Sequence, residues 1–163
     1  MTVCTGNICR SPMGEIILRN VFAKRGLADR VRVESSGVSD EEYGNPIDRR
    51  AVKVLRERGY EIPAHHFAHR ITRQEIEDTD LFLPMTASHM DALTRMLPLS
   101  KRNEVRMYRS FDPSLPDPRP GREAELDLVD PWYGGMREFE VAIDQLEQVA
   151  PYIADYVEQQ LDK

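Results

Sequence analysis

The chain has 163 residues, of which 31% are charged and 40% hydrophobic, and it carries a formal net charge of −6 at pH 7. This length suits one domain with a sizeable core, and the acidic balance argues against nucleic acid or an anionic membrane surface as the partner. The sequence has no apolar run near the roughly 20 residues of a membrane-spanning helix, no signal-peptide pattern and only two cysteines, so we expect a cytoplasmic protein.

Patterns typical of strands and helices alternate along the chain. Short strands are expected over residues 1–3, 31–33, 81–83 and 105–108. Apolar side chains at steps of three and four predict helices over residues 11–25, 47–58, 88–97 and 137–162. Thr72 as an N-cap with Glu75 three residues on, a capping box, predicts a short helix over 72–77. Pro151 is expected to kink or split the last helix, and polar loops are expected over 35–46 and 110–131. This alternation predicts an α/β fold with a parallel sheet.

The first strand is unusually short. Only three residues precede Cys4, whereas a buried central strand usually has about five. We therefore expect a strand that is truncated at its N-terminal end, within a single domain spanning residues 1–163.

Residues 4–11 carry the chemistry. They lie between the first strand and the first helix, where successive backbone N–H groups can point at an anion with the helix N-terminus behind them. These groups and Arg10 favour the thiolate form of Cys4, and Arg10 can form two parallel hydrogen bonds to phosphate. A thiolate beneath a bound phosphoryl group is placed for in-line attack. A lone cysteine is more often a small buried apolar residue, but Gly6 and Pro12 in this context favour catalysis.

The remaining residues of this loop are expected to line the phosphate site. They are Thr5, Gly6, Asn7, Ile8, Cys9 and Ser11.

Displacing an alkoxide or phenolate from phosphorus also needs a proton donor. Asp112, Asp117 and Asp130 each precede a proline, which by itself indicates only a turn. We choose Asp130 as the general acid because Trp132 and Tyr133 follow it and can form aromatic walls beside the acid.

Residues 4–12 resemble the signature of the low-molecular-weight protein tyrosine phosphatases, and the resemblance extends through 35–37, 46–55, His66 and 130–134. It implies a three-layer α/β sandwich with a central, mostly four-stranded parallel twisted sheet, helices on both faces and the phosphate loop between the first strand and helix. It also implies hydrolysis of phosphotyrosine in proteins through a phosphocysteine, with no metal or cofactor. Inorganic phosphate would be product and inhibitor, and the protein a monomer or weak dimer.

The resemblance assigns further roles residue by residue. Asn7, Ser11, Ser35 and His66 would form a hydrogen-bond network that supports the loop. His65 and His69 lie close to His66 in the chain, so the choice among these histidines stays open.

Cys9 has two interpretations. It is either a packing residue of the loop or, as the resemblance implies, the partner that pairs with Cys4 on oxidation and protects it.

The sequence also departs from the family pattern. Glu41 stands where the family usually has an aromatic residue lining the substrate slot, with Tyr43 two residues on, and Thr86 replaces a common aspartate. A sister group that acts on phosphoarginine carries threonine at the position of Ile8, so Ile8 favours the tyrosine-directed branch.

Two alternatives belong to other functional classes. Arsenate reductases of the thiol-cascade type need cysteines far downstream, and this chain has none after Cys9. A non-catalytic phosphoprotein-binding module would be expected to lack the nucleophile, the arginine or the acid, and all three are present.

Overall fold

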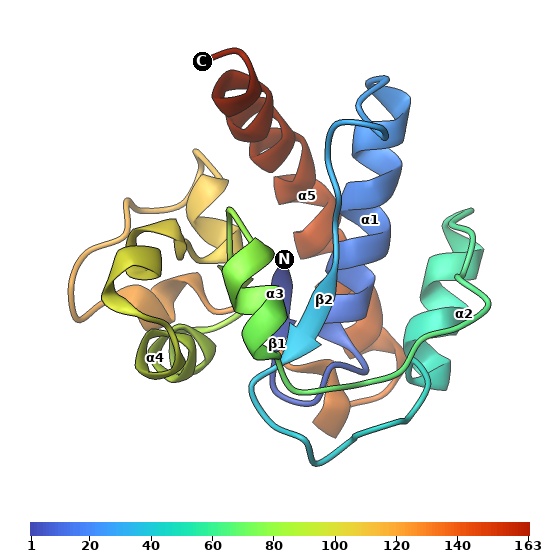
Figure 1. The fold of residues 1–163 in the computed structure, drawn as a ribbon. Helices are drawn as coiled ribbons and strands as arrows, with labels where there is room; N and C mark the ends of the chain where they lie inside the picture. Colours follow the sequence, from blue (N-terminus) through green and yellow to red (C-terminus); the bar gives the residue numbers. More distant parts are fainter.

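The computed structural model describes all residues from 1 to 163 (Figure 1). At its centre β1 (Thr2–Cys4) pairs in parallel with β2 (Ser35–Gly37) on one side and with β3 (Leu83–Pro84) on the other. In this register Thr2 lies opposite both Ser35 and Leu83. The three strands end at the same edge of the sheet, and the phosphate loop begins there.

Five α-helices surround the sheet. They are α1 (Arg10–Lys24), α2 (Arg49–Glu57), α3 (Arg73–Asp78), α4 (Ala87–Met96) and α5 (Met136–Leu161). Short 3₁₀ helices occur at Leu99–Glu104, Tyr108–Phe111, Glu123–Leu126 and Pro131–Tyr133.

The side chains of β1 alternate between two cores, as a strand requires. Cys4 belongs to the larger core with residues of α1, α2 and α5, such as Met13 and Leu146. Val3 belongs to a smaller core with Phe82 and Leu93. Helices therefore cover both faces of the sheet, with α1 and α5 side by side over one of them (Figure 1). The expectation of a parallel α/β fold flanked by helices is confirmed.

Two strand predictions need correction. The second strand lies at Ser35–Gly37, where we expected a loop, and residues 31–33 are not a strand. Glu34 accepts a hydrogen bond from the Thr2 amide, but no backbone N–H of residues 32–34 finds a partner, because no residue of β1 lies opposite them. Alternating apolar residues are insufficient for a strand without a neighbour to pair with.

The fourth strand expected over 105–108 is reduced to one parallel bridge between Val105 and Phe82, so three strands form the sheet. Pro151 does not split α5, which continues from Met136 to Leu161. No helix combines the length and apolar character that crossing a membrane requires.

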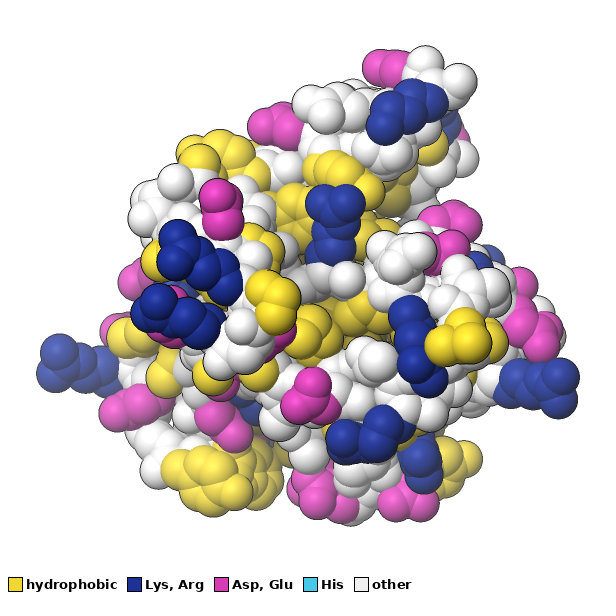
Figure 2. Space-filling view, turned by 90° about the vertical axis from the view of Figure 1, so that its left-hand side faces the viewer, with side chains coloured by type: hydrophobic (Ala, Val, Ile, Leu, Met, Phe, Trp, Pro, Cys, Tyr) yellow, Lys and Arg dark blue, Asp and Glu magenta, His cyan; other side chains and the backbone are white.

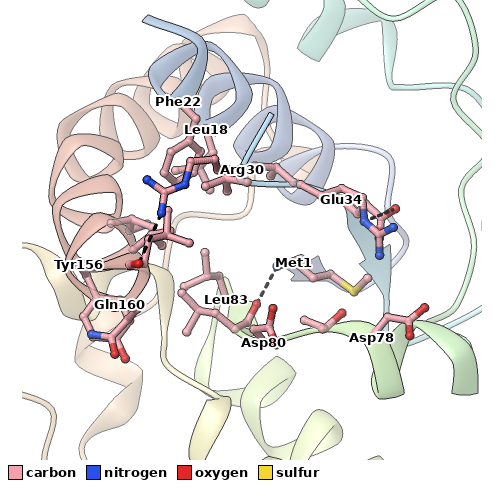
Figure 3. A pocket seen from close by; sticks show the side chains of 18 residues that line it. Met1, Leu18, Phe22, Arg30, Glu34, Asp78, Asp80, Leu83, Tyr156 and Gln160 are labelled. Carbon is pink, nitrogen blue, oxygen red and sulfur yellow. Dashed lines mark hydrogen bonds and ion pairs between the residues drawn. The ribbon is translucent and has the colours of Figure 1, made fainter. Parts of the chain in front are cut away.

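A cavity of about 650 Å³ lies at the N-terminal end of β1, opposite the phosphate loop along the strand (Figure 3). Leu18 and Phe22 of α1 line one side, Met1 and Leu83 lie at the sheet, and Tyr156 lies on α5. Figure 2 shows a face where hydrophobic side chains gather in a hollow with charged side chains of both signs around it. The cavity does not include any residue of the phosphate loop.

Candidate active site

The phosphate loop connects Cys4, the last residue of β1, to Arg10, the first residue of α1. It turns sharply at Asn7, whose φ of 60° makes it the only non-glycine residue with a positive φ. Asparagine tolerates this left-handed conformation better than most residues. The turn allows a short loop to curl in front of the N-terminus of α1, the geometry that binds anions.

Asn7 is fully buried and joins three segments of the chain. Its Nδ2 donates to Ser11 Oγ at 2.9 Å and to Ser35 Oγ at 3.0 Å. Ser35 in turn donates to Glu15 Oε2 at 2.5 Å. The Asn7 side chain therefore ties the loop to α1 and β2, and compensates for the unusual backbone conformation.

Cys4 is 3% exposed, and its Sγ lies 3.0 Å from Ser11 Oγ. The Ser11 oxygen already accepts a hydrogen bond from Asn7, so its own hydrogen is available to donate to sulfur. A hydrogen-bond donor in the first turn of α1 is therefore aimed at the Cys4 sulfur.

Arg10 lies at the base of the loop and is 5% exposed. One guanidinium nitrogen donates to the Leu128 carbonyl at 3.2 Å, and the other lies 3.3 Å from Asp130 Oδ2. The second Asp130 oxygen accepts a hydrogen bond from the Trp132 amide at 3.1 Å, which caps the 3₁₀ turn Pro131–Tyr133. Arg10 and Asp130, more than a hundred positions apart in the chain, thus lie in one site. The Asp130 side chain is 40% exposed, so it remains accessible.

The expected pocket wall is only partly brought together. Glu41 and Glu42 approach the loop, since a Cβ placed on Gly6 would lie 2.9 Å from Glu42 Cγ and 3.7 Å from Glu41 Oε1. Tyr43 and Tyr133 are strongly exposed, and neither hydroxyl forms a hydrogen bond with the loop.

Trp132 is the better-anchored aromatic residue. The Arg50 guanidinium lies 5.5 Å from its ring centroid and donates to the Gly134 carbonyl at 2.9 Å. Arg50 is itself paired with Asp48, the N-cap of α2. The turn that carries Asp130 is therefore attached to α2. The sequence did not predict this contact, because the resemblance over residues 46–55 assigned no role to Arg50.

Cys9 is buried directly before α1. Burial, and next the negative charge of Asp48, raise the pKa of the Cys9 thiol. Both cysteines are free, and Cys9 is therefore held as a thiol.

Two of the three candidate histidines contact the loop, in different ways. His66 Nε2 lies 2.7 Å from the Asn7 carbonyl oxygen, whereas His69 reaches Asn7 Oδ1 through its backbone N–H at 3.3 Å. The His69 ring forms an ion pair with Glu75 at 2.7 Å, and this hydrogen bond raises the pKa of His69 to about 9. His65 is exposed. The support from His69 was not predicted because it passes through the main chain.

His89 also contacts the loop and was not predicted. Its Nε2 lies 2.8 Å from Thr5 Oγ1. Nothing in the sequence around His89 distinguishes it from a histidine that packs in a core. No group of three His, Cys, Asp or Glu side chains is arranged to hold a metal ion.

Comparisons with known proteins identify the family of the chain. The family model "Low molecular weight phosphotyrosine protein phosphatase" matches residues 1–163. Low molecular weight protein-tyrosine phosphatase A of Mycobacterium tuberculosis is 39% identical over 159 residues, covering 98% of this chain and 91% of that protein. A protein tyrosine phosphatase structure from Entamoeba histolytica superposes with a TM-score of 0.87 at 24% identity, covering 98% and 96% of the two chains, which shows the shared fold.

A third similarity bears on substrate choice. The YwlE arginine phosphatase from Geobacillus stearothermophilus has a TM-score of 0.78 and is 28% identical, covering 98% of this chain and 92% of that one. The full-length family match and the identity to curated tyrosine phosphatases nonetheless decide the assignment. The chain belongs to the low-molecular-weight phosphotyrosine protein phosphatases, a family of enzymes.

Proposed function

We propose that this protein hydrolyses phosphotyrosine monoesters through a phosphocysteine intermediate, with Cys4 as nucleophile, Arg10 as phosphate clamp and Asp130 as general acid and base. The observation that carries the proposal is that Cys4 and Arg10, both buried, stand at the two ends of one loop, with Asp130 held against Arg10. Ser11 lies 3.0 Å from the Cys4 sulfur, and Arg10 lies 3.3 Å from Asp130.

In the first step the Cys4 thiolate attacks phosphorus and the bond from phosphorus to the tyrosyl oxygen breaks. Asp130 donates its proton to that oxygen, so a neutral phenol leaves. Loop N–H groups and Arg10 hold the oxygens of the transferring phosphoryl group, where negative charge must be stabilised.

In the second step water attacks the phosphocysteine. Asp130, now a carboxylate, takes a proton from the water as its oxygen bonds to phosphorus, and the bond between phosphorus and sulfur breaks. Inorganic phosphate is released and Cys4 returns to a thiolate. Ser11 supports this step because its hydroxyl can donate to the departing sulfur.

Two variants test the assignment of roles. Cys4→Ser should abolish turnover while phosphate binding survives, because the loop donors remain. Asp130→Asn should slow alkyl and phenyl phosphates far more than nitrophenyl phosphate, whose leaving group needs little protonation. Equal slowing of all three esters by Asp130→Asn would show that Asp130 is not the acid.

Phosphoarginine is the second candidate substrate, favoured by the similarity to the YwlE arginine phosphatase. Ile8 argues against it, because a buried apolar side chain packs against a flat ring better than it accommodates water beside a guanidinium. Phosphotyrosyl and phosphoarginyl versions of one peptide, compared by kcat/KM, decide between them. Ile8→Thr should shift the ratio towards phosphoarginine, and Glu41→Trp should improve phosphotyrosine binding.

Arsenate reduction is the remaining alternative on this fold. Incubation with arsenate and an external thiol should give no turnover, whereas nitrophenyl phosphate should be hydrolysed by the same sample. We also propose that residues 1–163 act as one domain, and that it works in a reducing cytoplasm. Both free cysteines are compatible with that location.

A further inference from the structure

His89 lies in the first turn of α4, which the carboxyl end of β3 places beside the phosphate loop. The Thr86 hydroxyl caps this helix by accepting the His89 amide at 3.2 Å. The side chain is 2% exposed, and its Nε2 lies 2.8 Å from the hydroxyl of Thr5, the residue that follows the nucleophile. A buried imidazole therefore touches the first residue of the loop.

We propose that His89 is a positioning residue for the phosphatase reaction: it donates a hydrogen bond to the Thr5 hydroxyl and thereby holds the first peptide of the phosphate loop in the geometry that binds phosphoryl oxygens. This inference rests on the proposed function. It assigns His89 no proton transfer and no contact with substrate.

The direction of the hydrogen bond follows from the other ring nitrogen. His89 Nδ1 is buried and has no partner. A buried N–H without an acceptor is rarer and more costly than a buried lone pair without a donor. The proton therefore resides on Nε2, and the ring donates to Thr5 rather than accepting from it.

The ring is also neutral at working pH. Burial, and next the positive charge of Arg10, lower the pKa of His89 to about 3. A lone pair at Nδ1 is compatible with the field of Arg10, whereas an imidazolium would add a second cation beside it. The hydrogen bond to Thr5 is consequently present throughout the pH range in which the enzyme works.

Thr5 is fixed at a second point, its carbonyl group, so a hydrogen bond to its side chain can restrict the conformation of the loop backbone. Its carbonyl accepts the Ser39 amide at 3.1 Å and passes so close to Gly37 that a Cβ there would lie 2.5 Å from the oxygen. With its carbonyl held by residues 37–39 and its side chain held by His89, Thr5 has little freedom to rotate within the loop. Preorganised loop donors are what stabilise charge in the transition state.

The test uses two variants that remove the bond and one that restores it. His89→Leu and Thr5→Val each keep the side-chain volume roughly and delete one partner. Each should lower kcat/KM about tenfold and weaken inorganic phosphate binding by a similar factor, the scale of one lost hydrogen bond. Because both delete the same bond, the double variant should lose little more than either single variant. His89→Gln retains an amide donor near Nε2 and should recover kcat/KM to within about threefold.

A packing role would give a different pattern. The matched control is Leu93→Ala on the same helix, fully buried in the smaller core, which should lower Tm but leave kcat/KM unchanged. Loss of stability in His89→Leu without rescue by Gln, or additive effects with Thr5→Val, would overturn the inference. So would imidazole NMR signals of His89 showing a proton on Nδ1.

Failure of the proposed function is separable from failure of this inference. Phosphate binding by isothermal titration and the NMR tautomer are measured without turnover. If the wild type binds phosphate but hydrolyses no ester, the reaction is wrong while His89 can still be judged. If the wild type is active and the His89 and Thr5 variants bind phosphate as tightly as it does, the positioning role fails alone.

Discussion

Asn7 combines an unfavourable backbone conformation with a side chain that forms hydrogen bonds with three other residues. Its φ of 60° costs a non-glycine residue roughly 1 kcal/mol. The bonds to Ser11 and Ser35 and the contact from the His69 amide stabilise that conformation. Asn7 therefore carries both the strained backbone conformation of the loop and the hydrogen bonds that hold the loop in place.

Substitutions at Asn7 should separate these two contributions. Asn7→Ala and Asn7→Gly both delete the network, so both should lower kcat/KM at least about tenfold. Asn7→Gly should be more stable than Asn7→Ala by about 1 kcal/mol, because glycine accepts a positive φ without strain. Urea denaturation and nitrophenyl phosphate turnover measure the two effects, with exposed Asn103→Ala as the neutral control. Equal stability of the two Asn7 variants would contradict the role assigned to its backbone.

Cys4 and Cys9 should differ in reactivity although both are buried. The raised pKa of Cys9, caused by burial and by Asp48, keeps it a thiol, whereas the Cys4 sulfur faces the Ser11 hydroxyl in the first turn of α1. Iodoacetamide at pH 7 should modify Cys4 about tenfold or more faster than Cys9, and inorganic phosphate should slow that labelling. Peptide mass spectrometry checks both statements. Labelling of Cys9 in native protein at the rate of Cys4 would refute them.

At the scale of elements, the second strand shows how pairing overrides local preference. Serine and glycine have low strand propensity, yet residues 35–37 form β2 because they lie in register with β1. Residues 31–33 have the better pattern but nothing to pair with. Helix prediction succeeded more fully, because amphipathic spacing reports burial against a core and does not depend on register. The N-cap Thr72 with Glu75 is one helix start visible in the sequence and present in the structure.

Hydrogen exchange should distinguish these two neighbouring segments. The amides of residues 32–34 form no backbone hydrogen bond, whereas those of Gly37 and Val38 donate to His69 and Cys4. We expect the first group to exchange roughly a hundredfold faster or more under native conditions. Exchange followed by NMR at pH 6 measures this ratio. Protection in 32–34 equal to that at Gly37 would mean that the strand extends further than the structure indicates.

For the molecule as a whole, the sequence was most informative where the residues of the site follow one another along the chain. Residues 4–11 could be recognised because strand, loop and helix start occur together, and Asp130 because its aromatic neighbours form a second motif. The contacts of His69, His89 and Arg50 could not be predicted, because each depends on the fold. His69 acts through its main chain, His89 through a buried ring, and Arg50 through the turn that carries Asp130.

The ion pair between His69 and Glu75 links the loop support to the stability of the whole molecule. The hydrogen bond to Glu75 raises the His69 pKa to about 9, against an ordinary value of 6.5. Burial is the largest single influence on the Glu75 pKa and raises it, but the hydrogen bonds from His69 and Thr72 and the charge of His69 together outweigh burial, and the pKa is lowered. Below pH 6.5 the folded and unfolded states both protonate His69, and the pair contributes its full stabilisation. As the pH rises through about 9 the folded protein loses that proton, and the contribution disappears.

The substitution His69→Gln should therefore lower the free energy of unfolding most near pH 6 and very little above pH 9.5. We expect the difference in free energy of unfolding from the wild type to be about 1 kcal/mol near pH 6, a modest value because the pair is partly exposed and therefore screened by solvent. Below the ordinary Glu75 pKa of 4.5 the difference should shrink again, because protonation of the carboxylate removes the partner. Urea denaturation at pH 4, 6, 7.5 and 9.5 gives the curve, and exposed His65→Gln should follow the wild type throughout. A His69→Gln curve parallel to the wild type between pH 6 and 9.5 would show that this pair does not anchor the loop support.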